Sequence, residues 1–311
     1  MPFDFSAVSA PFRMQPGLRR LAAGATQLTP LGDGDRALRE KLAVLSTCSS
    51  QALLCVPGFD AEPALDALCR HGAAEHPQAF GWDGTRAVAS QLGWAVAHDE
   101  ALPLADALPE VGRCLAALPA GWRRGGLLAL AFAEDFAVID ADSGCVPWLA
   151  VCLPSHWAPE QKVGRHFSAI HAPVADNAVL LAAGAHLMRL VTAPDRWERF
   201  VWTVTPHSRL NAHPDRSAGE AWPDNASPSE VAASAYWRTE RQTFIPLPDH
   251  RQAVFTIQVD VQPLVSAVVG AAQAAQLRDA LASMSPAVLA YRGLASAREC
   301  LLDWLDAQAC A

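Results

Sequence analysis

The sequence predicts an α+β fold, in which strands in the middle of the chain are flanked by helical segments. Apolar residues make up 51% of the 311 residues and charged residues 18%, a composition typical of a packed globular protein. Residues 126–154 and 199–261 are rich in β-branched and aromatic side chains with turns between them, which indicates strands. Residues 33–118 and 263–309 instead repeat apolar side chains at helical spacing. Strands, then helices, then strands again are typical of an antiparallel α+β sheet.

The individual elements follow from the same patterns. The strands that we expect are 126–133, 136–140, 147–153, 199–205, 236–247 and 252–261, the last two joined as an antiparallel hairpin. The helices that we expect are 33–45, 62–71, 87–94, one within 102–118, 159–171, 177–191, 263–283 and 286–309, with a long loop over 206–234. We therefore expect one domain: a mainly helical layer (1–125), a sheet core (126–262) and C-terminal helices (263–311).

Charge and motifs exclude several classes of function. The formal net charge of −8 argues against a nucleic-acid partner, which would need a basic surface. The chain has no signal-peptide pattern and no apolar run of spanning length, so we expect a cytoplasmic protein without a membrane partner. Its eight cysteines contain no C-x-x-C pair, which argues against a zinc site. Phosphate-loop, Gly-x-Ser-x-Gly and His-Glu-x-x-His motifs are absent from the sequence.

The stretch 152–174 places a histidine at the end of a predicted helix. Pro159 suits a first helical position, and Pro173 predicts that the helix ends at about His171. His171 can then present its imidazole to a pocket. The helix C-terminus would favour the protonated ring by about 1 kcal/mol or less, which a metal or haem iron would overcome. A structural histidine is the commoner case, and His186, on the apolar face predicted for 177–191, is the second candidate ligand.

Two further stretches could contribute to a site. The run Ala182-Ala183-Gly184-Ala185 makes a flat helix surface that another helix or a planar ligand could approach closely. Residues 238–243 are the densest polar run on any predicted strand. Alternation places Arg238, Glu240 and Gln242 on one face and Thr239, Arg241 and Thr243 on the other. Such a face is either solvated, the commoner case, or the wall of a polar pocket.

These stretches resemble a known family, the haem-dependent oxidative N-demethylase-like proteins. The matching residues form three blocks in order along the chain. The first contains Cys152, Pro154, Ser155, Trp157, Lys162, Gly164, Ile170-His171 and Pro173-Val174; the second contains Arg238, Glu240-Arg241-Gln242-Thr243, Leu247-Pro248 and Phe255-Thr256-Ile257; the third contains Tyr291-Arg292-Gly293-Leu294, Leu301-Leu302 and Trp304-Leu305. Gly17-Leu18 and Pro30-Leu31 fit the start of the pattern.

The resemblance implies a PAS-like antiparallel sheet that binds haem b through a histidine. It implies His171 as the axial, iron-binding ligand, and Trp157 and Lys162 as further cofactor contacts. Glu240, Arg238 and Arg241 become the candidate catalytic residues, lining the pocket and contacting the haem propionates.

The implied reaction removes a methyl group oxidatively from a small secondary or tertiary amine such as dimethylamine, with O2 consumed and formaldehyde released. The electrons would come from NAD(P)H through a reductase partner that carries flavin and an iron–sulfur cluster. Glu240 is the best candidate in the sequence for the counter-charge of a methylammonium substrate. Two alternatives remain: a haem-binding sensor or carrier with the same fold and no turnover, and a haem-free protein that binds a small ligand.

Overall fold

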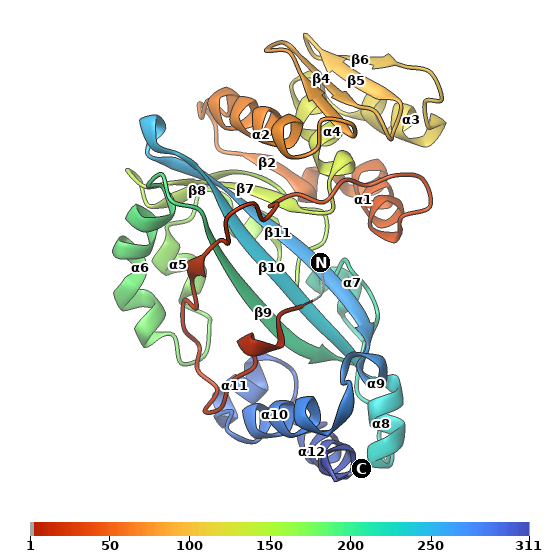
Figure 1. The fold of residues 1–311 in the computed structure, drawn as a ribbon, viewed down its shortest axis with the longest axis vertical. Coiled ribbons are helices and arrows are strands. Elements are labelled where there is room, and N and C mark those ends of the chain that lie inside the picture. The colour runs from red at the N-terminus through yellow and green to blue at the C-terminus, as the bar shows by residue number, and fades with distance from the viewer. Residues whose placement is uncertain (1–2, 311) are drawn as a thin grey trace.

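The centre of the molecule is a seven-stranded antiparallel sheet, which confirms the α+β prediction (Figure 1). The structure is a computed structural model and describes residues 3–310. The strand order is β1-β9-β10-β11-β7-β8-β2. Its strands are β1 (Arg19–Arg20), β2 (Leu53–Cys55), β7 (Asp135–Asp140), β8 (Cys145–Ala150), β9 (Trp197–Thr205), β10 (Tyr236–Leu247) and β11 (Gln252–Pro263). The longest pairing is the predicted hairpin of β10 and β11, twelve residues in register.

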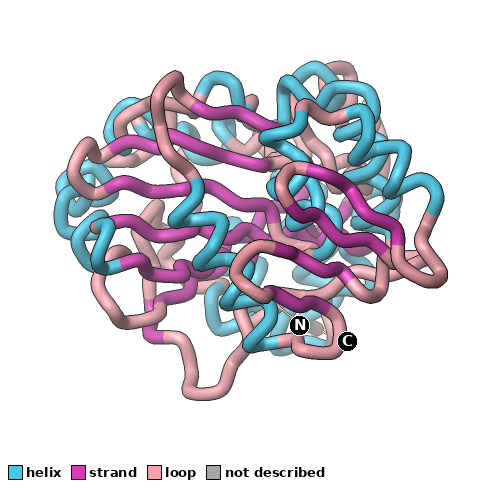
Figure 2. The backbone as a smooth tube through the Cα atoms, turned by 90° about the horizontal axis from the view of Figure 1, so that it is seen from above, coloured by secondary structure: helices cyan, strands magenta, loops and turns pink. Residues whose placement is uncertain are grey.

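A second, four-stranded antiparallel sheet corrects the expectation of a helix over 87–94. It has the order β3-β4-β5-β6 and lies apart from the main sheet (Figure 2). Its strands are β3 (Phe80–Trp82), β4 (Arg86–Ala89), β5 (Trp94–Ala97) and β6 (Glu100–Pro103). The alanines of this region favour a helix by propensity alone, but Gly93 adopts a φ of +70° and turns the chain between β4 and β5. The N-terminal part is therefore mixed rather than mainly helical.

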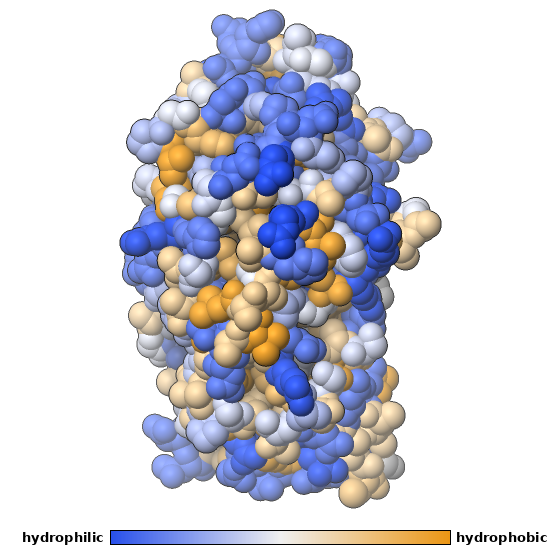
Figure 3. All heavy atoms as spheres, turned by 90° about the vertical axis from the view of Figure 1, so that its left-hand side faces the viewer, coloured by the Kyte–Doolittle hydropathy of each residue, from blue (hydrophilic) through white to orange (hydrophobic). Residues whose placement is uncertain are grey.

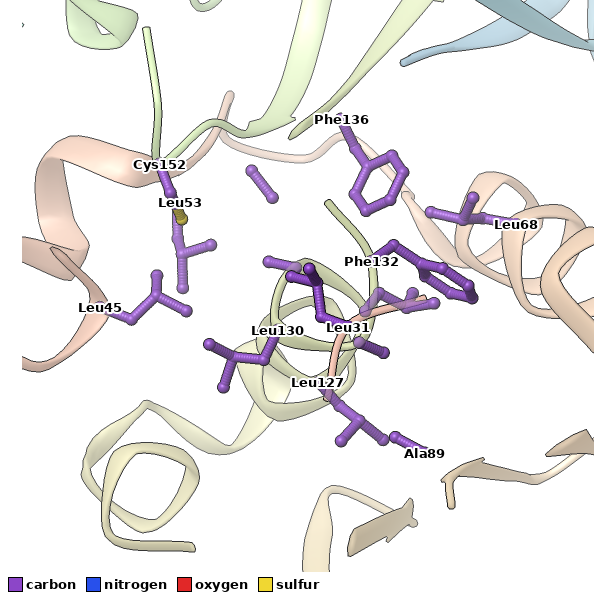
Figure 4. Close-up of a cluster of buried hydrophobic side chains, with 14 of the residues drawn as sticks. Leu31, Leu45, Leu53, Leu68, Ala89, Leu127, Leu130, Phe132, Phe136 and Cys152 are labelled. Carbon is purple, nitrogen blue, oxygen red and sulfur yellow. The ribbon is translucent and has the colours of Figure 1, made fainter. Parts of the chain in front are cut away.

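The four long helices of the N-terminal part surround the largest core. They are α1 (Arg36–Ala52), α2 (Glu62–Glu75), α3 (Pro109–Ala117) and α4 (Arg123–Ala131). Helix α4 occupies the stretch predicted as a strand over 126–133, and that prediction is wrong. Residues 125–131 are all buried, and Leu127 and Leu130 contact side chains from several other elements (Figure 4). A helix buried on every side loses its 3.6-residue hydrophobic period, so its apolar run is indistinguishable from that of a buried strand.

The segment predicted as one helix over 159–171 is broken into two pieces. Pro159–Gln161 forms a single 3₁₀ turn, and α5 covers only Phe167–His171. Gly164, with a φ of +71°, separates them. The predicted end at His171 is confirmed, and the next helix, α6 (Ala178–Val191), matches its prediction.

Most of the remaining helices gather at one end of the β9–β10–β11 unit, near the C-terminus (Figure 1). The loop 206–234 contains α7 (Pro214–Ser217) and α8 (Pro228–Ser234). The sequence predicted two C-terminal helices, whereas the structure has four: α9 (Leu264–Ala267), α10 (Gly270–Ala282), α11 (Pro286–Tyr291) and α12 (Arg298–Ala309). The breaks fall at Gly270 and Gly293, whose φ angles of +81° and +65° are unsuited to a helix. Across residues 3–310, no helix combines the length and apolarity needed to cross a membrane.

A buried polar network joins α1 to the main sheet. Lys41 is completely buried; its Nζ donates to the carbonyl oxygens of Phe132 (3.0 Å) and Glu134 (2.7 Å) and lies 3.1 Å from Oδ1 of Asp135. The other carboxylate oxygen of Asp135 accepts from the Leu153 amide at 2.6 Å. The Glu134 side chain is also buried, and burial raises its pKa to about 7. Its charged form is therefore disfavoured in the folded state.

We expect Glu134→Gln to stabilise the protein above pH 7 and to change little below pH 4.5. Glu134 ionises near pH 4.5 in the unfolded chain and near pH 7 in the folded protein. The free energy of unfolding of the wild type therefore falls as the pH rises from 4.5 to 7, by on the order of 3 kcal/mol. The neutral glutamine avoids this loss while keeping an oxygen for the Thr29 amide. Urea unfolding of both proteins at pH 5 and pH 8 measures the difference. Equal pH dependence in the two proteins would contradict the assignment.

Candidate functional site

The site begins with the alternation of side chains on β9 and β10, which the structure confirms on β10. Gln242 lies opposite Arg199, and Glu240 lies opposite Val201. Because directly paired residues of antiparallel strands share a face, these four side chains, three of them polar, form one surface. We call this surface the Glu240 face. Arg241 and its neighbours lie on the other face of the sheet.

The Glu240 face carries buried polar atoms that no protein group satisfies. Trp197 Nε1, Arg199 Nε and Thr203 Oγ1 are inaccessible to solvent and have no hydrogen-bond partner among residues 3–310. All three belong to the odd-numbered positions of β9, whose side chains are partly exposed, whereas Glu198 and Trp202 on the other face are buried. Three such groups on one face of a single strand are rare in a closed interior. The surface is therefore suited to a ligand that offers hydrogen-bond acceptors.

Arg199 is the strongest of these groups. Burial lowers the pKa of its guanidinium, and the charge of Glu240 offsets part of that effect. No carboxylate of the described chain forms an ion pair with it. Glu240 is 8% exposed, and its Oε2 accepts from Gln242 Nε2 at 2.6 Å. The Glu240 face thus presents one cation and one oriented carboxylate.

Two residues of the third matching sequence block, Tyr291 and Arg292, interact electrostatically with Glu240. Burial lowers the pKa of Arg292 to about 10, with smaller contributions from Tyr291, Arg199 and Glu240. Its Nη1 donates to the Trp202 carbonyl at the edge of β9. Tyr291 is half-exposed, and burial of its ring raises the pKa of its hydroxyl.

His171 lies near the same face with one ring nitrogen free. Its Nδ1 lies 2.8 Å from the Phe167 carbonyl oxygen, which can only accept, so Nδ1 carries the proton. Nε2 has no hydrogen-bond partner among the described residues and retains its lone pair when the ring is neutral. Burial, Arg199 and Lys162 lower the pKa of the ring, whereas the bond to Phe167 raises it. A neutral imidazole with a free Nε2 is the form that ligates iron.

Local packing fixes the end of α5 that carries His171. The rings of Phe167 and His171 lie 4.1 Å apart. Phe167 packs against Gly184 of α6 so closely that an added Cβ would lie 2.9 Å from the ring, so the flat surface predicted over 182–185 receives the neighbouring helix. Lys162 Nζ donates to the Ile170 carbonyl at 3.1 Å. Asn177 Nδ2 donates to the carbonyls of His171 and Ala172, both at 3.0 Å.

Two of the predicted arginines are engaged in structural contacts. Arg238 shares the Glu240 face but is 1% exposed, and it donates to Ser155 Oγ (2.8 Å) and to the carbonyls of Pro154, Arg209 and Leu210. It thereby joins the 152–155 segment to the 206–234 loop. Arg241 lies on the opposite face, where its Nε pairs with Glu198 Oε2 at 3.0 Å. The structure does not bring either guanidinium next to His171.

The other predicted residues lie around the site rather than inside it. Trp157 packs on the apolar cluster of β7, β8 and β11. His186 is exposed on α6, on the side away from the buried Leu180, Gly184 and Met188, so its expected place on the apolar face is wrong. Figure 3 shows the side of the molecule that carries α5 and α6, where apolar side chains gather between charged ones. Arg199 was missed by sequence reasoning, although pairing its strand with β10 would have placed it opposite Gln242.

The residues present fit a haem group. Within residues 3–310 no cluster of three or more His, Cys, Asp or Glu side chains could hold a bare metal ion. The porphyrin supplies four nitrogen ligands to a haem iron, so the protein would need to supply only one further ligand. Cationic side chains could pair with the haem propionates. His171 Nε2 and Arg199 offer these two functions. Three surface cavities lie elsewhere on the molecule, and His171 lines none of them.

Comparison with known protein families agrees with this chemistry. Residues 37–302 match the family described as haem-dependent oxidative N-demethylase, alpha subunit-like. The match covers the main sheet except β1, together with α5, α6 and the Glu240 face, and so includes every residue discussed in this subsection. The chain therefore belongs to the haem-dependent oxidative N-demethylase alpha-subunit-like family.

Proposed function

We propose that this protein binds haem b through His171 and oxidatively removes a methyl group from a small secondary or tertiary amine. The observation that carries the proposal is the neutral His171 ring with its free Nε2, close enough to Arg199 for that charge to lower its pKa. A PAS-like arrangement, in which helices inserted between strands cover a ligand on the sheet, is consistent with this placement. The amine, O2 and electrons would react to give the demethylated amine, formaldehyde and water.

Arg199 would hold a haem propionate. A buried guanidinium without a carboxylate partner is costly unless a ligand supplies one, and a propionate does so. Arg292 adds a second positive charge at the edge of the face. This assignment moves the propionate contact to Arg199, because the donors of Arg238 are engaged by the chain and Arg241 lies on the other face of the sheet.

Glu240 would bind the ammonium group of the substrate. Gln242 orients its carboxylate through the 2.6 Å hydrogen bond, and the Tyr291 ring lies toward the mouth of the same region. A methylammonium ion entering a partly desolvated space needs such a counter-charge. The bound haem would supply the oxygen chemistry, while these side chains bind the amine, orient its methyl group and limit the access of water.

The electrons would come from outside the chain. Demethylation by O2 needs two electrons and two protons for each molecule of formaldehyde and water released. We propose a separate NAD(P)H reductase with flavin and an iron–sulfur cluster as their source, in keeping with the alpha-subunit-like description of the family.

His171→Ala should remove the iron ligand. We expect the haem-loaded variant to lose the Soret position of the wild type and to bind haem more weakly, because only the porphyrin contacts remain. Absorption spectra after haem titration measure both effects. The matched control is His186→Ala on the exposed face of α6, which should leave the spectrum unchanged. A shift with His186→Ala and none with His171→Ala would reverse the assignment.

Arg199→Gln should weaken haem binding by about tenfold to a hundredfold, the range for loss of one charge-assisted hydrogen bond. The Soret position should stay as in the wild type because His171 is untouched. Arg20→Gln on β1, an exposed arginine, serves as the control. Haem affinity unchanged by Arg199→Gln would remove the propionate role.

Glu240→Gln should raise the dissociation constant of dimethylamine at least about tenfold while haem still loads, because an uncharged amide cannot balance the ammonium ion. Titration of the haem-loaded protein with dimethylamine, followed by absorption, gives the constant, and formaldehyde release with a reductase supplied gives turnover. Asp249→Asn in the exposed hairpin turn is the control. Unaltered amine affinity would show that another group binds the ammonium. A wild type that binds haem but releases no formaldehyde from any methylamine would favour a sensor or carrier.

A further inference from the structure

A partly open cavity lies on the opposite face of the main sheet, away from Glu240 and His171. Its volume is about 350 Å³. Its floor consists of side chains from three adjacent strands: Phe200, Thr239, Arg241, Gln258 and Asp260. Phe3 from the N-terminal segment and residues 35–37 at the start of α1 form its sides. We call this space the Arg241 cavity.

Arg241 presents an unused donor to this cavity. The side chain is 8% exposed. Its Nε pairs with Glu198, and its Nη1 donates to the Thr26 carbonyl at 2.8 Å. Its Nη2 is buried and has no partner among the described residues. A buried guanidinium nitrogen without a hydrogen-bond partner favours the binding of a ligand that supplies an acceptor oxygen.

The N-terminus of α1 offers further donors at the same place. Asp35 occupies the N-cap position, but its side chain makes no capping bond and accepts instead from the Gly32 amide at 2.7 Å. The first-turn amides of residues 36–38 therefore have no acceptor in the described chain. Free amides and the positive end of the helix dipole both favour a negatively charged group. This observation is independent of Arg241 and indicates the same ligand chemistry.

Carboxylates limit what the anionic group can be. Arg241 pairs with Glu198 and Arg36 with Glu40, which leaves Asp35 and the exposed Asp260 without a cationic partner. A phosphate or another multiply charged anion would be repelled by these two residues. A ligand with one carboxylate and one ammonium group could pair with Arg241 through the first group and with a free carboxylate of the cavity through the second. The rings of Phe3 and Phe200 supply an apolar wall for a small aliphatic body.

We propose that the Arg241 cavity binds a small zwitterion of the amino-acid type. The carboxylate contacts Arg241 Nη2 and the first-turn amides of α1, the ammonium group lies beside Asp260, and the aliphatic part contacts the two phenylalanines. Because Arg241 and Glu240 are adjacent on β10 but on opposite faces, this ligand does not compete with haem or amine. The inference stands whether or not the proposed demethylation is correct.

Three probes of matched size test the chemistry on the full-length, haem-loaded protein carrying Glu240→Gln, so that an alkylamine is not held at the proposed amine site. They are leucine, 4-methylpentanoate, which lacks the ammonium group, and 3-methylbutylamine, which lacks the carboxylate. By calorimetric titration we expect leucine to bind with a dissociation constant of roughly 1 mM or lower, 4-methylpentanoate several-fold more weakly, and 3-methylbutylamine not measurably. No saturable binding of leucine up to about 50 mM, or equal binding of leucine and 3-methylbutylamine, would overturn the proposal.

Two variants locate the site. Arg241→Gln should weaken both carboxylate probes at least about tenfold. Asp260→Asn should weaken leucine about threefold and leave 4-methylpentanoate unchanged, because it removes only the ammonium contact. Arg241→Gln breaks the ion pair with Glu198 and could prevent folding. Asp260 is exposed, so Asp260→Asn should fold and still tests the proposal in that case. Asp249→Asn is the control. Leucine affinity unchanged in Asp260→Asn and in any folded Arg241→Gln would place the binding elsewhere.

Discussion

The two-residue period of β9 and β10 is the constraint on which the site depends. Pairing of the two strands over nine residues places Arg199, Glu240 and Gln242 on one side and Glu198, Arg241 and Thr243 on the other. A shift of one residue in register would exchange these sets. Arg199 would then lie on the face of Arg241, and Glu198 on the face of Glu240. The chemistry of the protein is therefore set first by strand register and only then by residue type.

The protonation state of His171 follows from a competition between burial and the helix end. A helix C-terminus favours the imidazolium by about 1 kcal/mol or less. Burial and the positive charges of Arg199 and Lys162 act in the other direction, and the pKa of the ring is lowered. The short length of α5, five residues, leaves it only a small dipole. The neutral ring thus results from its surroundings, and the Phe167 carbonyl then decides which nitrogen keeps the proton.

The parts of the fold that the sequence predicted are those with a clear local pattern. The strands of the β10–β11 hairpin are rich in β-branched and aromatic side chains on either side of a turn, and α6 repeats its apolar side chains at helical spacing, so both were predicted with nearly correct bounds. Helix α4 has no period because it is buried all round, and the 159–171 segment has a helical period that Gly164 interrupts. At the candidate site, local sequence patterns were enough to propose His171 and Glu240. Arg199 depends on which strand pairs with β10, a long-range contact that no local pattern contains.

The opposite face of the sheet holds β10 in place behind Glu240. Behind Glu240 and Gln242, Thr243 Oγ1 lies 2.7 Å from Thr256 Oγ1 and accepts from Gln27 Nε2 at 2.9 Å. Gln27 belongs to the N-terminal segment, which crosses this face of the sheet (Figure 1). A buried network of this kind fixes the strand against its neighbours. This network orders β10 from the face opposite Glu240. A ligand that binds at Glu240 therefore need not supply the free energy to order the strand. Removing the Gln27 contact should therefore loosen the Glu240 face although the residue is on the other side of the sheet.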